Sequence, residues 1–412
     1  MHDNHLPRRG LTFAAASFSI LTAFGASALP VPLMAHWTEA FGLTTGDIGM
    51  TVVSYVAGCF LALLFLARLS EGVGRRGAVL AGLVFGVLST IGLLRAQAPA
   101  DLMTARLLQG LYCGVTTTAA MSWAVDAAPL GAAWLGAAMS SAGPLLGFVA
   151  ATVAAGAVLE TGAAGPAGIF TMLLVLQSAA ALLTLCAAET LRSRNMRRAF
   201  TPAVIPPAGC GRRLAVAAAG IVGTWAVTCF FQGFSAKVAA ELWGADAPLA
   251  LLSSAVYLML VLPNAAGGFA SARFDAKRIA APAAALFGLF GFAAFAAAAL
   301  KSPMLYIPAM VLCGLMQGAL TAASMKVLLE GSSAADRARL IAAVYLIGYI
   351  GTGIPNFCVM TAGEAATFTN IALGFTLWFT LTFTAVFFFM KRLEAKDSSA
   401  EAPALEAVRA AR

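Results

Sequence analysis

Charge gathers in one short stretch of an otherwise apolar chain, ARLSEGVGRRGAVL, which covers residues 67–80. Only 11% of the 412 residues are charged, yet three arginines and one glutamate fall within nine positions here. A carboxylate in such a turn can pair with arginines or with a helix N-terminus, where the helix dipole favours an anion. Gly74 permits a tight turn with a positive φ. We predict that Glu71, Gly74, Arg75 and Arg76 form a gating latch that favours one of two conformations.

A second set of polar side chains interrupts long apolar stretches. At about 100° per residue, each of three predicted helices collects its polar residues on one face. A charge inside an apolar span is costly and usually functional, so Arg106 leads this set. Ser and Thr in such spans commonly bond to backbone, and Arg106 could instead brace backbone carbonyls. The residues of this set are Arg106, Gln109, Thr117, Trp225, Thr228, Gln232, Gln317 and Thr321.

Other kinds of chemistry find little support in the sequence. The seven cysteines show no Cys-x-x-Cys spacing, and the three histidines are scattered, so we expect no metal site and no cofactor. Clustered Asp, His or Cys at membrane edges, which a lipid-modifying enzyme would need, are missing, so we expect no enzyme. The net charge of +8 is spread in short clusters between apolar runs, which argues against a nucleic-acid partner.

The elements that must position these residues are membrane helices. Apolar residues make up 60% of the chain, and the mean hydropathy is +0.87. Apolar runs of about 20 residues are long enough to cross a bilayer as helices, and they lack the alternation of barrel strands. We predict an all-α integral membrane protein with twelve spans, at 12–35, 46–67, 77–95, 101–125, 131–158, 168–188, 213–238, 247–271, 279–299, 303–328, 338–361 and 368–390.

A polar, basic linker divides these spans six and six. We expect an N-terminal half at 1–188, a linker at 189–212, a C-terminal half at 213–391 and a tail at 392–412. With the N-terminus in the cytoplasm, 22 of the 26 Lys and Arg residues fall on the cytoplasmic side and three on the other. This bias predicts a multi-pass inner-membrane protein with both termini cytoplasmic. The first apolar run resembles a signal peptide, but it continues past the candidate cleavage site.

The charged stretch resembles the signature of the major facilitator superfamily of secondary transporters. That signature lies between the second and third helices and reads, in outline, Gly-x3-Asp-Arg-x-Gly-Arg-Arg. Here Glu71 stands for the Asp, Gly74 matches, and Arg75 and Arg76 supply the basic pair. Ala67 and Gly72 depart from the pattern.

The resemblance extends to other spans and to an internal repeat. The fourth span contains RLLQG (106–110), similar to the family's Arg-x-x-Gln-Gly element. The fifth contains GPLLG (143–147), similar to an element common in exporters. Residues 268–278 are a degenerate copy of the charged stretch, and GLMQG (314–318) parallels RLLQG. The resemblance assigns gating roles to Arg273 and Asp275, and helix packing to Gly110, Gly143, Pro144 and Gly147.

The resemblance implies two six-helix halves around a central cavity, with the first, fourth, seventh and tenth helices lining it. It thereby makes the eight polar and aromatic residues of the set led by Arg106 the candidates for substrate binding. We therefore expect a monomer, surrounded by membrane lipids, that moves a small organic solute by alternating access and acts as an exporter. Uptake of a metabolite such as an organic anion is the alternative, followed by a non-transporting sensor. A proton is a candidate coupling ion, although no Asp or Glu lies in the middle of a predicted span.

Overall fold

The computed structural model describes residues 8–191, 195–199, 206–207, 209–271 and 273–410, and the secondary structure in these ranges is helical. The short α4 and α9 lie outside the spans, and a π-helical segment, Ala62–Leu66, extends α3. The helices are α1 (Arg9–Ala28), α2 (Pro30–Phe41), α3 (Thr45–Leu61), α4 (Leu69–Val73), α5 (Arg75–Leu94), α6 (Pro99–Asp126), α7 (Trp134–Glu160), α8 (Pro166–Cys186), α9 (Met196–Ala199), α10 (Gly211–Trp243), α11 (Leu249–Ser271), α12 (Ala276–Ala299), α13 (Pro303–Leu329), α14 (Ala334–Ala362) and α15 (Phe368–Ala410).

Twelve helical segments have the length of a membrane span. Eleven of them, within the described ranges, are also apolar enough to cross a bilayer by composition alone. The twelfth, α6, is 28 residues long and carries Asp101, Arg106 and Asp126, which make it the most polar of the set. The integral-membrane fold with twelve helices agrees with the expectation from the sequence.

The first span is broken in its middle. Helix α1 ends at Ala28 and α2 begins at Pro30, and together they form one span of 33 residues, Arg9–Phe41. Pro30 has no N–H, so the carbonyl of Ala26 loses its regular helical donor. The sequence placed this span at 12–35, and the structure lengthens it at both ends.

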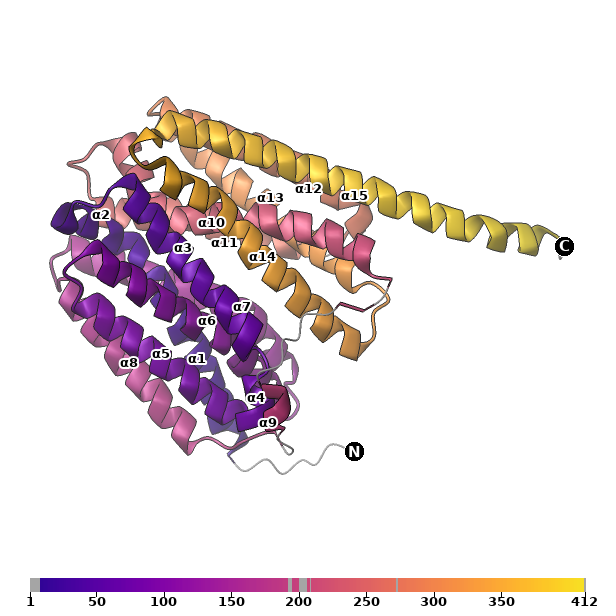
Figure 1. The fold of residues 1–412 in the computed structure, drawn as a ribbon, viewed down its shortest axis with the longest axis horizontal. Coiled ribbons are helices and arrows are strands. Elements are labelled where there is room, and N and C mark those ends of the chain that lie inside the picture. The colour runs from indigo at the N-terminus through magenta and orange to yellow at the C-terminus, as the bar shows by residue number, and fades with distance from the viewer. Residues whose placement is uncertain (1–7, 192–194, 200–205, 208, 272, 411–412) are drawn as a thin grey trace.

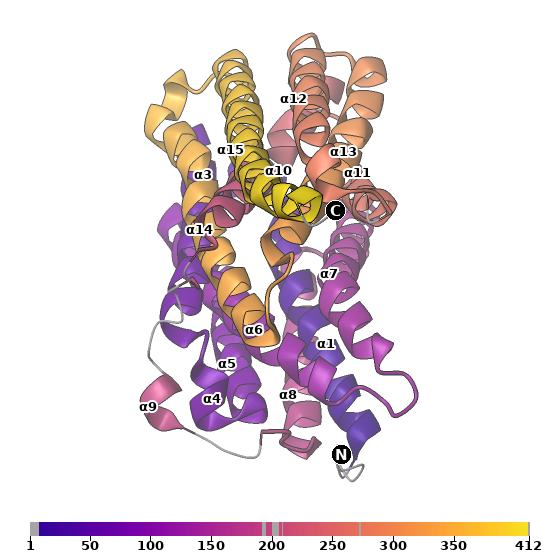
Figure 2. The ribbon, with the colours of Figure 1, turned by 90° about the vertical axis from the view of Figure 1, so that its right-hand side faces the viewer.

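The helices form two bundles, α1–α8 and α10–α15, which Figure 1 shows from indigo to magenta and from rose to yellow. The bundles approach one another around α2, α3 and α10, and they diverge toward α4 and α9 (Figures 1 and 2). The main pairs between the bundles are α3 with α14, α7 with α11, and α10 and α11 with α2. We name the end with residues 41–45 and 362–368 the closed end, and the end with residues 67–76 and 271–276 the motif end.

Glycines set the closest helix crossings in both bundles. A Cβ on Gly110 of α6 would overlap the carbonyl oxygen of Tyr55 and lie 2.7 Å from the amide nitrogen of Cys59, both on α3. A Cβ on Gly318 of α13 would likewise overlap the carbonyl oxygen of Asn264 on α11. The two Gln-Gly pairs that the sequence shows as a repeat therefore occupy equivalent crossings, where only a bare backbone fits.

Helix α7 crosses α1 at its own small residues. A Cβ on Gly147 would lie 2.7 Å from the carbonyl oxygen of Leu21 and 3.0 Å from the amide nitrogen of Gly25. A Cβ on Gly143 would instead meet side-chain atoms, 2.6 Å from Met139 Cε and 2.9 Å from Ile20 Cγ2, and Pro144 lies inside the helix. The structure thus places this glycine–proline element at a packing crossing within the N-terminal bundle.

The linker and the C-terminal tail both contain helical structure that the sequence analysis did not predict. The linker contains the short helix α9, which packs against α4. A Cβ on Gly72 of α4 would lie 2.6 Å from the Cβ of Ala199. This contact explains a glycine where the related signature has arginine, because a larger side chain would collide with α9. At the C-terminus, α15 continues as one helix to Ala410.

Candidate functional site

The turn at the motif end has the backbone conformation that its glycine predicts. Gly74 has φ 90° and ψ 166°, and it separates α4 from α5. Glu71 accepts two hydrogen bonds from Arg68, from Nε and Nη2, each 2.9 Å long. The hydrogen bond to this carboxylate raises the pKa of Arg68. Glu71 is therefore bound within its own turn in this conformation.

The arginines of the turn have different partners from those the sequence suggested. Arg75 Nε lies 3.2 Å from Asp126 Oδ2, and Nη1 donates to Ser70 Oγ at 2.9 Å. The carboxylate at the N-terminus of α5 belongs to Glu189, which accepts from the backbone N–H groups of Arg75 and Arg76 at 3.0 and 3.1 Å. Such an anion stabilises the exposed N–H groups of a helix start.

Sequence reasoning missed Glu189 and Asp126 in this network. Both are acids that directly follow an apolar span and lie on the same side as the charged turn, and that placement was the available signal. All of these contacts lie within the N-terminal bundle and its linker. The assignment of Glu71, Gly74, Arg75 and Arg76 to a gate stays a prediction.

The degenerate copy of this turn lies at the equivalent place in the other bundle. Asp275 caps α12 and accepts from the backbone N–H of Lys277 at 3.0 Å, and it lies 3.7 Å from Arg278. Arg273 is exposed. Lys326 reaches the same turn from α13 and donates to the carbonyl of Phe274 at 3.0 Å. The gating role of Arg273 and Asp275 also stays a prediction.

Arg106 and Gln109 lie against the break between α1 and α2. Gln109 Nε2 donates to the carbonyl of Ala26 at 2.7 Å, which replaces the helical donor that Pro30 cannot supply. Arg106 Nη1 contacts Gln109 Oε1 and lies 3.4 Å from the carbonyl of Ser27. The two side chains thus brace a proline-broken helix, the structural role that the sequence left open.

The surroundings of Arg106 are aromatic and neutral. Its guanidinium carbon lies 4.4 Å from the ring centre of Tyr55, a cation–π distance. Tyr55 in turn donates to Cys113 Sγ at 3.3 Å. Thr117 faces this region but donates to the carbonyl of Cys113 at 2.8 Å, the backbone bond common for threonine in membrane helices.

In the C-terminal bundle a polar ladder joins α10 to α13. Gln317 Nε2 donates to Thr228 Oγ1 at 2.6 Å, and Thr321 Oγ1 donates to Thr224 Oγ1 at 3.2 Å. Thr228 and Thr321 are half-buried, whereas Gln317 is buried. Three of the four residues were candidates from the sequence; Thr224 was missed although it lies one turn before Thr228.

Aromatic residues that the sequence did not single out surround this ladder. Gln232 Nε2 lies 3.5 Å from the hydroxyl of Tyr257 on α11. The ring of Trp225 packs edge-on against Tyr345 and Tyr349 of α14, with centroids 5.0 and 5.2 Å apart. These tyrosines sit in otherwise ordinary apolar runs, so only the packing of α11 and α14 beside α10 reveals them.

Small residues and two polar bonds join the bundles at the closed end. Ser254 Oγ of α11 donates to the carbonyl of Thr152 on α7 at 3.1 Å, and Lys237 Nζ of α10 donates to Thr45 Oγ1 on α3 at 2.6 Å. A Cβ on Gly156 would lie 2.5 Å from Ser254 Oγ. We call these contacts between the two bundles the seal. No local sequence pattern marks these residues, so the sequence did not predict them.

Just below the seal, aromatic contact continues between the bundles. Phe148 of α7 packs edge-on against Tyr257, with centroids 6.3 Å apart, and against Phe24 of α1 at 5.5 Å. Gly233 of α10, the residue after Gln232, meets α3 of the other half, where a Cβ would lie 2.5 Å from Val52 Cγ2, one helical turn from Tyr55. The polar residues of the two halves therefore face one another behind the closed end.

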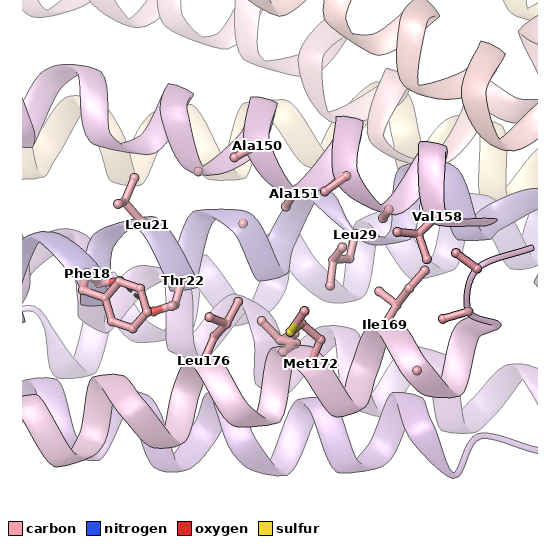
Figure 3. Close-up of a pocket in the computed structure, with 18 residues that line it drawn as sticks. Phe18, Leu21, Thr22, Leu29, Ala150, Ala151, Val158, Ile169, Met172 and Leu176 are labelled. Carbon is pink, nitrogen blue, oxygen red and sulfur yellow. Dashed lines mark hydrogen bonds between the residues drawn. The ribbon is translucent and has the colours of Figure 1, made fainter. Parts of the chain in front are cut away.

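A separate cavity of about 590 Å³ lies on the flank of the N-terminal bundle. Figure 3 shows its apolar walls, contributed by α1, α7 and α8. Met172 on its rim is 63% exposed on a membrane-spanning helix, so this cavity opens toward the bilayer rather than between the halves. None of the substrate-binding candidates lines it, although the helix-packing residue Gly147 does. The labelled walls are Phe18, Leu21, Thr22, Leu29, Ala150, Ala151, Val158, Ile169, Met172 and Leu176.

In the described ranges of the chain, no group of three His, Cys, Asp or Glu side chains is placed to hold a metal ion. What remains is a pair of membrane-spanning bundles with polar faces opposed beneath a seal at one end. That arrangement defines a membrane transporter with two halves.

Comparison with known proteins identifies the family. The model for the major facilitator superfamily matches residues 16–355, so the chain belongs to this superfamily of transporters. Among solved structures it is similar to a D-xylose–proton symporter, at 13% identity and a TM-score of 0.72, over 92% of this chain and 97% of that one.

Two further structures share the fold. The nucleoside transporter NupG is 12% identical with a TM-score of 0.68, over 92% of this chain and 99% of that one. A bacterial homologue of the human lysosomal transporter Spinster is 14% identical with a TM-score of 0.67, over 94% and 97%. No curated protein matches the chain in sequence.

Proposed function

We propose that this secondary transporter exports a small organic solute across the inner membrane by alternating access. The observation that carries the proposal is the seal at the closed end, behind which α10 of one half packs on α3 of the other beside Gln232 and Tyr55. A solute held between the halves would be released when the seal breaks and the motif end closes. The first and last described residues lie at the motif end, and the charge bias of the sequence favours the cytoplasm for that end.

The substrate site in this proposal is the ladder of α10 and α13 with its aromatic surround. Thr228, Gln317 and Thr321 supply hydrogen-bonding groups, and Trp225 supplies a partly buried ring. Gln232 extends the ladder toward the closed end through Tyr257. An apolar pocket with a few convergent polar groups is the usual form of a small-molecule site.

We expect replacement of Gln317 by alanine to weaken substrate affinity about two- to tenfold. It removes one hydrogen bond to the substrate or to Thr228, which is worth roughly 0.5–1.5 kcal/mol. Cells that overexpress the transporter, and deletion cells, would be screened for accumulation of a panel of radiolabelled organic compounds, with and without a proton gradient. Compounds that depend on the wild-type protein would then be measured in the variant.

Thr376→Val serves as the control for this change, because Thr376 lies on α15 and donates to its own helix at Ala372. Unchanged affinity in a well-folded Gln317→Ala variant would remove the ladder from the binding site. Active compounds that accumulate inside expressing cells, rather than leaving them, would reverse the proposed direction.

Glu71→Gln should lower the transport rate severalfold at equal protein abundance. The carboxylate holds Arg68 in the present conformation and is 40% exposed, so the pair is worth at most about 1 kcal/mol. We propose that Glu71 changes partners when the motif end closes, and glutamine would weaken that exchange. Initial rates in vesicles would be compared with those of Glu394→Gln, which alters an exposed i,i+3 pair in the C-terminal helix. Equal rates in both variants would make Glu71 a topology signal only.

Uptake of an organic anion is the second candidate function. The specific observation in its favour is Arg106, a buried cation that contacts neutral groups among the described residues. Direction and charge are independent properties, so an anionic substrate is compatible with either function.

A further inference from the structure

The positive charge of the Arg106 side chain is only partly compensated by the groups around it. Its side chain is 2% exposed, and among the described residues it forms no salt bridge. A carbonyl, an amide oxygen and the Tyr55 ring face it, and all three are neutral. Its Nε is buried and has no hydrogen-bond acceptor in the described chain. The nearest acid along the helix, Asp101, instead accepts from the backbone of Gln97 and Ala98. A buried cation in this setting favours an anion beside it.

The opposite half presents hydrogen-bonding groups that lack partners. Gln232 and Gln317 are 3% and 1% exposed, and one amide end of each, Oε1, makes no hydrogen bond within the described residues. Buried polar groups are costly unless paired. A primary amide can turn either its oxygen or its nitrogen to a ligand, and a hydroxyl group satisfies both because it donates and accepts.

These two features face one another across the interface between the halves. Gly233 of α10, the residue after Gln232, packs so closely on α3 that a Cβ there would lie 2.5 Å from Val52 Cγ2. Val52 is one helical turn from Tyr55, whose ring Arg106 contacts, and the Tyr257 hydroxyl lies 3.5 Å from Gln232 Nε2. Among the described residues, no carboxylate pairs with Arg106, and the mid-span sequence contains no Asp or Glu that could receive an ammonium group. A cationic or zwitterionic ligand would therefore meet Arg106 without a compensating acid.

We propose that the transported solute is a small organic anion that carries at least one hydroxyl group. Its anionic group lies on the Arg106 side, and its hydroxyl reaches the amides of Gln232 and Gln317. The aromatic side chains of Tyr55, Tyr257 and Trp225 suit an apolar body between these ends. This inference rests on the proposed function, because it assigns a substrate class to the same central site.

The first experiment measures the thermal stability of the purified full-length protein in detergent with matched probes. Each hydroxycarboxylate in a panel is tested with its primary amide and its deoxy analogue; mandelate, mandelamide and phenylacetate form one such set. We expect hydroxycarboxylates to raise the Tm in a saturable manner. The amides should raise it at concentrations at least tenfold higher or not at all, and the deoxy acids should be intermediate.

Variants connect this specificity to Arg106. Arg106 and Gln109 both bond to the first span, so Arg106→Ala and Gln109→Glu each remove a hydrogen bond to it, and the folded fraction of each variant is measured first. Gln109→Glu is the sharper change because it keeps the guanidinium. It places a carboxylate against the guanidinium and supplies the missing countercharge from within the protein. We expect a folded variant that no longer distinguishes acids from amides. Arg95→Lys, at an exposed arginine near the closed end, should keep the wild-type preference.

The outcomes separate the inference from the proposed function. Amides that bind as well as acids, with both lost in Gln317→Ala, would overturn the anionic class and leave the central site in place. Binding that survives unchanged in Gln317→Ala and in Gln109→Glu would overturn the site itself. A panel in which no hydroxycarboxylate binds in a manner sensitive to Gln109→Glu would also overturn the inference.

Discussion

Gly110→Val is expected to eliminate most of the folded protein. The crossing of α3 and α6 leaves no room for a Cβ, since one would overlap the carbonyl oxygen of Tyr55 and lie 2.8 Å from the Cα of Gly58. The helices would have to separate, and overpacking of this kind typically costs about 1–3 kcal/mol, with more where backbone blocks the way. Fluorescence-detected size-exclusion chromatography of a tagged protein would measure the monodisperse fraction.

Two other glycines provide a control for this change and an equivalent change in the other half. Gly374→Val changes a glycine on α15 with open space around it, and we expect a wild-type elution profile. Gly318→Val changes the equivalent crossing in the other half, where the carbonyl of Asn264 blocks a Cβ, and we expect the same loss as for Gly110→Val. A monodisperse Gly110→Val protein at wild-type yield would contradict the close packing of α3 and α6.

Gly156→Leu should abolish transport while leaving the protein folded. Gly156 lies on the α7 face that meets α11 at the closed end, where even a Cβ would lie 2.5 Å from Ser254 Oγ and 3.1 Å from the carbonyl oxygen of Ala250. A leucine there obstructs the seal but not the interior of either bundle. A penalty of about 1–3 kcal/mol on the sealed state would shift the conformational equilibrium by roughly 5- to 150-fold.

Distances between the halves report this shift directly. Spin labels at Glu160→Cys and Asp246→Cys, two exposed positions at the closed end of opposite halves, should move apart in the Gly156→Leu background. Val153→Leu, on an exposed face of the same helix, should change neither the label distance nor transport. If Gly156→Leu retained both the short distance and wild-type transport, the α7–α11 contact would not be the seal.

Much of the fold could be read from local sequence. Length and apolarity of each stretch are sufficient to place a membrane helix, because the bilayer demands an internally hydrogen-bonded span of about 20 residues. Glycine at position 74 predicts the left-handed turn that the structure shows, with φ 90°. The repeated Gln-Gly pairs at 109–110 and 317–318 predict equivalent positions in two related halves, and both glycines lie at equivalent crossings.

The candidate site could be read only in part. The helical period put Thr228 and Gln317 among the candidates, and the structure joins them by a hydrogen bond of 2.6 Å. The helical period could not show that Gln109 bonds to the carbonyl of Ala26, 83 positions away, where a proline has removed a helical donor. Nor could it choose Glu189 over Glu71 as the acid at the start of α5.

The sequence by itself determined which segments span the membrane, how they divide into halves and which polar residues lie within them. Each of these depends on properties of neighbouring residues: hydropathy, helical period and turn chemistry. Only the tertiary structure decided that Arg106 braces the first span and lies against the Tyr55 ring, and that the seal forms at Gly156 and Ser254. Those facts depend on contacts between residues far apart in the chain, and such contacts follow from how the helices pack rather than from any local pattern.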